Sequence, residues 1–205
     1  MKRFGMDYFI AAAMCAIIMF VMSSSAAAGI IYVKWNSPGS GDPPVFDGQS
    51  WDTAFHKVQD GINASISGDD IWVAAGTYVE NVVMKDGVAL YGGFSGTETS
   101  RDQRDWTANR TILDGNKQGC VIKIQNCPSS TTRVDGFTIR NGTGTASGGA
   151  NTAGGGIYCT SSSPVIADNL IRDNSATNGA GIYTTASAST IRNNTIRNKS
   201  YSSRN

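Results

Sequence analysis

The sequence has a single histidine, His56, among its 205 residues. A Ser/His/Asp triad, a Cys/His nucleophile pair and a histidine-based zinc site all need histidine beside other reactive groups. His56 lies opposite the apolar face of its segment, so such sites are not expected within this chain. The chain also lacks a Gly-rich loop followed by Lys and Ser/Thr, the pattern that cradles nucleotide phosphates.

Neither sign of charge dominates. Lys and Arg number 17, and Asp and Glu number 16. Without the leader described next, which carries Lys2, Arg3 and Asp7, basic and acidic residues balance. Nucleic acid and anionic membrane surfaces are therefore not expected as partners.

Long apolar runs are scarce, and the clearest one lies near the N-terminus. Lys2 and Arg3 precede the run from Phe9 to Met22, and small residues follow as far as Ala28. This order predicts a secretory signal peptide over residues 1–28. A transmembrane anchor is the alternative, but a span needs about 20 apolar residues. We expect a secreted or cell-surface protein with no membrane span after signal removal.

Three cysteines follow the leader: Cys120, Cys127 and Cys159. Two interpretations stay open, and the sequence does not decide the redox state. Cys120 and Cys127 form a disulfide if their Cα atoms lie within about 7 Å. Alternatively, all three are small buried hydrophobic residues.

Helical periodicity is limited to one segment, residues 50–65. Its apolar residues follow one helical face and are Trp51, Ala54, Phe55, Val58 and Ile62. We predict one helix here, with Ser50 as its N-cap. Together with a short strand and a loop it makes up residues 29–70 and caps the first unit of a repeat.

The repeat becomes visible near the end of the chain. Residues 157–172 align with residues 182–197 at a constant offset, so Ile157 falls on Ile182 and Ile171 on Ile196. Short segments rich in Ile, Val, Thr and Tyr, bounded by Gly, Asn, Asp and Ser, are typical of strands and turns. Aligning "TILDGN" with "TIRNGT" places Ile112 and Ile139 in the column that continues to Ile171 and Ile196. We expect this column to point inward.

The run "GDDIWVAAGTYVENVVMKDGVALYGGFSGTETSRDQRDWTANRTILDG", followed by N-x-I and GGGIY-type coils, resembles the right-handed parallel β-helix family of secreted bacterial proteins, the pectate-lyase-like fold. The resemblance implies an all-β solenoid of three sheets around an apolar interior, over residues 71–205. Its members include polysaccharide lyases, hydrolases and adhesive surface proteins. The fold alone does not choose among these functions.

Two polar columns are candidate ligand sites. The first contains Asp114, Asn141, Asp173 and Asn198, and the second contains Arg140, Arg172 and Arg197. Asp114 and Asp173 lie two coils apart, roughly 9.5 Å, and cannot share one Ca²⁺ directly. No metal or cofactor is expected, and Ca²⁺ enters only if the protein is a lyase. The arginine column is a candidate site for an acidic polysaccharide, unless neighbouring carboxylates offset its charge.

Two functions follow from these features. The first is a structural or binding role toward a polysaccharide or a cell-surface partner. The alternative is a polysaccharide lyase or glycoside hydrolase, whose catalytic residues the sequence does not identify. A glycosidase-type pair of catalytic acids could come from Asp102, Asp105, Asp114 and Asp135, but the sequence does not show that any two of them converge.

The repeat is still in phase at Ile196, and no atypical unit follows it. Solenoids normally end in a unit that covers the last apolar interior. We therefore expect the natural β-helix to continue beyond Asn205, or the open C-terminal coil to stack on another chain and self-associate.

Overall fold

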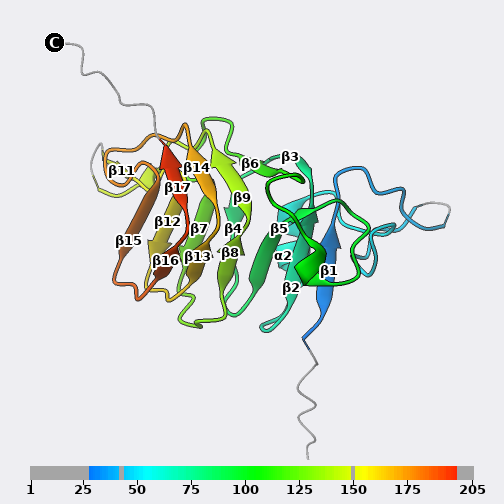
Figure 1. Cartoon of the computed structure of the whole chain (residues 1–205). Coiled ribbons are helices and arrows are strands. Elements are labelled where there is room, and N and C mark those ends of the chain that lie inside the picture. Colours follow the sequence, from blue (N-terminus) through cyan, green and yellow to red (C-terminus); the bar gives the residue numbers. More distant parts are fainter. Residues whose placement is uncertain (1–27, 42–43, 149–150, 198–205) are drawn as a thin grey trace, which may run out of the picture.

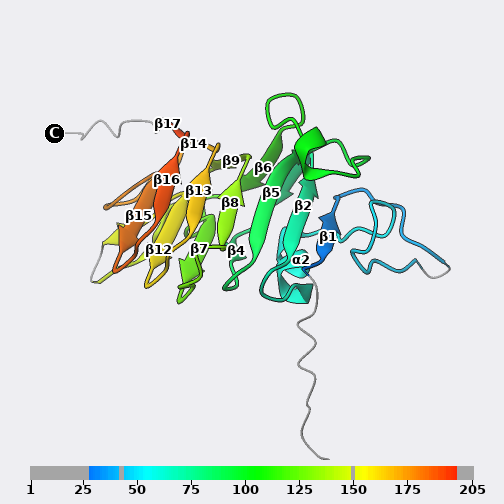
Figure 2. The same ribbon diagram turned by 60° about the horizontal axis from the view of Figure 1, so that its bottom comes forward.

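The computed structural model describes residues 28–41, 44–148 and 151–197. Three parallel sheets wrap around one apolar interior (Figures 1 and 2). The first sheet contains β1 (Ile30–Val33), β2 (Asp70–Ala74), β5 (Ala89–Phe94), β8 (Arg133–Asp135), β13 (Val165–Ala167) and β16 (Thr190–Arg192). The second contains β3 (Gly76–Val79), β6 (Thr111–Asp114), β9 (Phe137–Arg140), β14 (Leu170–Arg172) and β17 (Thr195–Arg197). The third contains β4 (Val82–Val83), β7 (Ile122–Gln125), β12 (Ile157–Thr160) and β15 (Ile182–Thr185).

Each coil takes one strand from each sheet in turn, which confirms the predicted parallel β-helix. The helix α2 (Val58–Ala64) lies at the N-terminal end of the stack (Figure 1). Two insertions interrupt the coils: residues 95–110, which contain the short 3-10 helix η1 (Arg101–Gln103), and a hairpin of β10 (Thr145–Ala146) and β11 (Thr152–Ala153).

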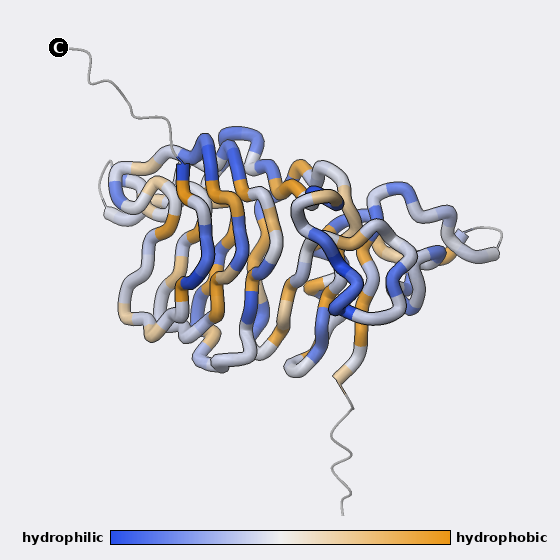
Figure 3. Tube along the Cα trace, in the orientation of Figure 1, coloured by the Kyte–Doolittle hydropathy of each residue, from blue (hydrophilic) through white to orange (hydrophobic). Residues whose placement is uncertain are grey.

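The interior follows from strand alternation, since every second side chain points inward. In the second sheet Ile139, Ile171 and Ile196 pair in register, as the sequence predicts. Ile139 and Ile171 are fully buried. Hydrophobic positions recur at corresponding places along successive coils (Figure 3).

The predicted alignment of Ile112 with Ile139 is wrong by one residue. Leu113 pairs with Ile139 and is fully buried, whereas Ile112 pairs with Thr138 and points outward. The error arises because "TILDGN" and "TIRNGT" look alike residue by residue. The register is instead set by which side chains are buried, and here Leu113 is the one that points inward. Asp114 consequently lies in register with Arg140, not with Asn141.

The polar corners between strands are closed by side chains of the following coil. At the corner between the first and second sheets, Asn169 Oδ1 accepts a hydrogen bond from Phe137 N at 2.9 Å, and Asn194 Oδ1 accepts one from Asn169 N at 3.0 Å. Ser162 Oγ accepts from Cys127 N at 3.0 Å at another corner. Buried backbone groups are costly without a partner, so these side chains make the turns compatible with a dry interior.

The helix begins later than predicted, at Val58 and not after Ser50. The Glu80 carboxylate fixes this start, because it accepts hydrogen bonds from Val58 N at 2.8 Å and Gln59 N at 3.0 Å. Phe55 instead lies in extended backbone that bridges to Val33. The apolar residues before the helix therefore cover the edge of β1, a tertiary role that helical periodicity does not reveal.

The insertion of residues 95–110 packs over the outer face of the first sheet. Trp72 and Phe94 stack there with ring centroids 4.7 Å apart, and both are buried. Trp51 Nε1 donates a hydrogen bond to Glu98 O at 2.9 Å, which ties the insertion to the N-terminal loop. The insertion continues to Arg110, beside the second sheet, where it forms one wall of a groove.

Candidate functional site

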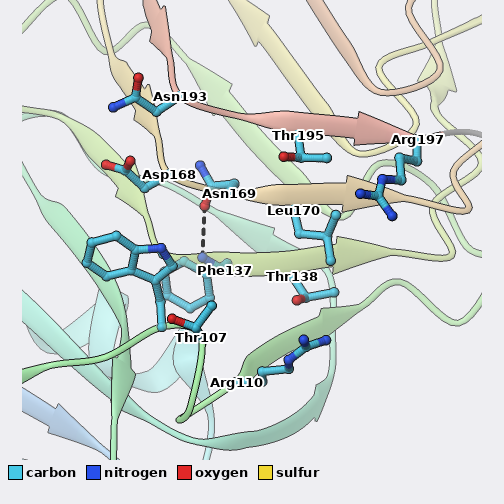
Figure 4. Close-up of a pocket in the computed structure, with 12 residues that line it drawn as sticks. Thr107, Arg110, Phe137, Thr138, Asp168, Asn169, Leu170, Asn193, Thr195 and Arg197 are labelled. Carbon is cyan, nitrogen blue, oxygen red and sulfur yellow. Dashed lines mark hydrogen bonds between the residues drawn. The ribbon is translucent and has the colours of Figure 1, made fainter.

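A groove of about 370 Å³ lies between the insertion of residues 95–110 and the outer face of the second sheet (Figure 4). Thr138, Leu170 and Thr195 lie on its floor and come from three successive coils in register. The other main lining residues are Trp106, Thr107, Arg110, Asp168, Asn193 and Arg197. We call this hollow the second-sheet groove.

Two rim residues of the groove occupy a strained corner of the backbone. Asp168 and Asn193 have φ values of 57° and 55°. Asp and Asn tolerate this left-handed region better than most residues, because their short side chains bond locally. Figure 4 shows Asp168 and Asn193 at the end of the groove opposite Arg197.

Trp106 is held over the groove by a partly buried arginine. The Arg104 guanidinium lies 4.8 Å from the Trp106 ring centroid and 5.1 Å from that of Tyr91. Arg104 Nη2 donates to Asp135 Oδ1 at 2.6 Å, and the arginine side chain is only 11% exposed. Trp106 itself is 42% exposed. The arrangement therefore offers a fixed aromatic surface to solvent.

The arginine column follows the C-terminal ends of the second-sheet strands. Arg140, Arg172 and Arg197 pair in register and point outward, as predicted. Arg140 Nε lies 2.8 Å from Asp114 Oδ2, and Arg172 forms an ion pair with the adjacent Asp173. Neighbouring carboxylates therefore offset two of the three charges.

Asp114 is the most constrained acid of the column. Burial pushes the pKa of its carboxyl upward, but hydrogen bonds from Asn116 N, Asn141 Nδ2 and Arg140 Nε outweigh burial and hold the pKa below its usual value. Asn141 Nδ2 lies 3.0 and 2.9 Å from the two carboxylate oxygens. Asp114 and Asn141 thus contact each other directly, although they belong to different columns.

The six predicted site residues are divided among three places. Arg197 lines the second-sheet groove. Asn141 and Asp173 line a separate hollow of about 330 Å³ at the next corner. Arg140, Arg172 and Asp114 form the paired strip described above. Asn198, which the sequence places in the acidic column, lies outside the described residues.

Among the described residues, no group of three His, Cys, Asp or Glu side chains is placed to hold a metal ion. Of the acids proposed as a catalytic pair, Asp114 is bonded to Arg140, and Asp135 is bonded to Arg104 and Arg133. Asp105 caps its own loop by accepting from Thr107 N at 2.9 Å. The carboxylate that lines the second-sheet groove within the described chain is Asp168.

The cysteines are buried small residues in this structure, the second of the two interpretations, and Cys120 and Cys127 do not form a disulfide. Cys120, Cys127 and Cys159 are free and buried in this structure. Burial is the largest cause of the raised pKa of the Cys120 and Cys127 thiols. Cys127 and Cys159 belong to the apolar interior, whereas Cys120 is buried outside that cluster.

Sequence reasoning missed Trp106, Arg110 and the groove they line. These residues belong to an insertion between β5 and β6, outside the repeated columns. The available signal was the segment "SRDQRDW", in which two arginines precede a tryptophan in a polar stretch. Such a segment interrupts the strand pattern and is typical of a functional loop.

In the part of the chain that the structure describes, no helix is both long enough and apolar enough to cross a membrane. The leader proposed over residues 1–28 lies, except for Ala28, outside the described residues, so the signal peptide stays a prediction.

Comparison with known proteins adds a family. Searches of curated proteins and of solved structures found no match. A family model described as "Right handed beta helix region" matches residues 49–204. The match covers most of the chain and agrees with the three stacked parallel sheets. The chain therefore belongs to the right-handed β-helix family.

Proposed function

We propose that this protein is a secreted or cell-surface β-helix that binds a segment of polysaccharide in the second-sheet groove. The observation that carries the proposal is the exposed Trp106 ring, held in place by the partly buried Arg104. A fixed aromatic surface suits stacking against the C–H face of a sugar ring, because little conformational entropy is lost on binding.

The floor and rim of the groove supply the polar contacts that a sugar chain needs. Thr138 and Thr195 offer hydroxyl groups, and Asn193 offers an amide. Hydroxyls and amides both donate and accept hydrogen bonds, as the hydroxyls of a saccharide do. Leu170 adds an apolar contact between the two threonines.

Two arginines support an acidic saccharide as the ligand. Arg110 and Arg197 line the groove, and neither forms an ion pair with another described residue. Guanidinium groups bind carboxylates through two parallel hydrogen bonds. Because Arg140 and Arg172 are already paired, these two arginines are the better candidates for carboxylates of the chain.

The proposal is tested by affinity electrophoresis through gels that contain pectate, alginate or a neutral glucan. We expect pectate or alginate to retard the protein, and Trp106→Ala to weaken binding at least tenfold. Trp35→Ala is the matched control, because Trp35 is 55% exposed but does not line the groove. If no polymer retards the protein, or if both variants behave alike, the groove is not the binding site.

The enzymatic alternative is tested with the same polymers. Incubation with pectate and alginate, with and without Ca²⁺, is followed by measuring chain length and unsaturated products. We expect binding without depolymerisation. Depolymerisation that requires residues of the groove would establish the lyase or hydrolase alternative instead.

A further inference from the structure

A second hollow, of about 350 Å³, lies on the outer face of the first sheet. Asp70, Ala89 and Arg133 occupy corresponding positions of three adjacent strands, because Ala89 pairs in register with both of its neighbours. The strand spacing separates the Cα atoms of Asp70 and Arg133 by roughly 9.6 Å. A small side chain between two longer ones leaves a notch, which we call the Ala89 notch.

The charged groups on either side of the notch are held in place. Asp70 Oδ2 lies 3.1 Å from Arg101 Nη1, and Arg133 Nη1 lies 2.8 Å from Asp135 Oδ2. The Asp70 and Arg133 side chains are 28% and 23% exposed. A carboxylate has about four acceptor sites and a guanidinium five donor hydrogens, so each group retains bonding capacity for a ligand.

The charges around the notch limit the class of ligand. Asp70 and Asp135 pair with Arg101, Arg104 and Arg133, which leaves a single excess positive charge, so the site does not favour a ligand with a large net charge. The notch does place a hydrogen-bond acceptor, the Asp70 carboxylate, on one side and a donor, the Arg133 guanidinium, on the other. A ligand with a positive group and a negative group would make a charge-assisted bond at each side, and such bonds are about twice as strong as neutral ones.

The solvation of Asp70 points the same way. Burial is the largest cause of its raised pKa, and the opposing attraction of Arg101 does not cancel it. The carboxylate is therefore incompletely stabilised by its surroundings, and a further cationic donor would stabilise it. The hydroxyl groups of Ser130 and Thr131 also line the notch and are exposed. The volume lies near the lower end of small-molecule sites, about 300–1,000 Å³.

We propose that the Ala89 notch binds a small zwitterion of the amino-acid type, with its ammonium group toward Asp70 and its carboxylate toward Arg133. The site lies on a different sheet from the second-sheet groove and does not depend on the polysaccharide proposal. The aliphatic part of the ligand rests on Ala89 and on the edge of Tyr91, which also lines the notch.

The test uses the purified protein and the twenty free L-amino acids, observed by saturation-transfer NMR and followed by calorimetry. Acetate, methylammonium, cellobiose and maltose are measured in parallel. At least one amino acid is expected to bind, and each half-ligand at least tenfold more weakly. If no amino acid binds, or if the disaccharides bind in the notch and the amino acids do not, the proposal is wrong.

Variants locate the binding. Ala89→Leu fills the notch without removing a charge and is expected to abolish amino-acid binding. Asp70→Asn keeps the shape of the side chain and is expected to weaken binding at least tenfold. Val165→Leu is the matched control, since Val165 lies in the same outward column next to Arg133, and its binding is expected to stay within twofold of the parent protein.

Circular dichroism and thermal melting establish that each variant is folded. Ala89→Leu is also expected to keep polysaccharide binding, because Ala89 does not line the second-sheet groove. The effect of Trp106→Ala on polysaccharide binding therefore tests the second-sheet groove alone. If folded Ala89→Leu still binds amino acids, the Ala89 notch proposal is wrong.

Discussion

The first and last described coils differ in what covers their apolar side chains. Near the N-terminal end, Trp72 and Phe94 point outward from the first sheet, yet they are only 3% and 0% exposed because loops pack over them. In the last described coil, Ile191 and Ile196 occupy interior columns, yet they are 46% and 49% exposed. The repeat therefore specifies the coil, while segments outside the repeat decide which surfaces are buried.

The largest effect is expected inside the stack. Ile171→Asp should unfold the protein, because Ile171 is fully buried and an unpaired buried carboxylate costs several kcal/mol, a large share of a domain's stability. Ile196→Asp, in the same column, should cost much less because Ile196 is about half exposed. Urea unfolding followed by circular dichroism measures both. Equal costs would show that the two ends of the column have the same environment.

A smaller effect is expected where the insertion contacts the first sheet. Arg104→Met should destabilise the protein by about 2 kcal/mol, because it removes a charged hydrogen bond to the buried Asp135, which keeps Arg133 as its remaining partner. It should also weaken polysaccharide binding by releasing Trp106. Arg192→Met is the control, since Arg192 is exposed and lies in the same outward column as Asp135, two coils farther on. Thermal melting and affinity electrophoresis report the two effects; a stable variant with normal binding would remove Arg104 from this role.

The smallest effect concerns the last described coil. We expect residues 29–205 to self-associate weakly through this coil, because Ile191 and Ile196 are partly exposed there. Ile191→Lys together with Ile196→Lys should reduce association without unfolding the protein. Light scattering over a range of concentrations measures it. A parent protein that stays monomeric throughout would contradict the expectation.

The periodic parts of the fold could be predicted from the sequence. Ile157, Ile171 and their partners one repeat later lie in the predicted register, because both copies have the same length between corners. The register of Ile112 was wrong because the alignment there rested on similar letters in a coil that carries a long insertion. Equal spacing is therefore a more reliable guide to a column than local similarity.

The candidate site was harder to predict, for two physical reasons. The pairing of Asp114 with Arg140 depends on the correct strand register. The sequence alignment was off by one residue and therefore placed Asp114 beside Asn141. The place of Trp106 depends on Arg104 and Asp135, which lie 31 residues apart in sequence and meet only after the insertion folds over the sheet. Neither contact leaves a periodic signal.

The hydrogen bonds at the corners give the stack a direction. In each case the earlier coil donates a backbone N–H and the later coil supplies the accepting side chain: Phe137 to Asn169, Asn169 to Asn194, and Cys127 to Ser162. At these three corners, the backbone N–H of one coil is paired only when the next coil is in place. The same asparagines also donate back to the earlier coil, from Asn169 Nδ2 to Val134 O and from Asn194 Nδ2 to Ile166 O. A cut between two of these coils would therefore leave both a backbone N–H and a backbone C=O unpaired at the corner of the N-terminal piece.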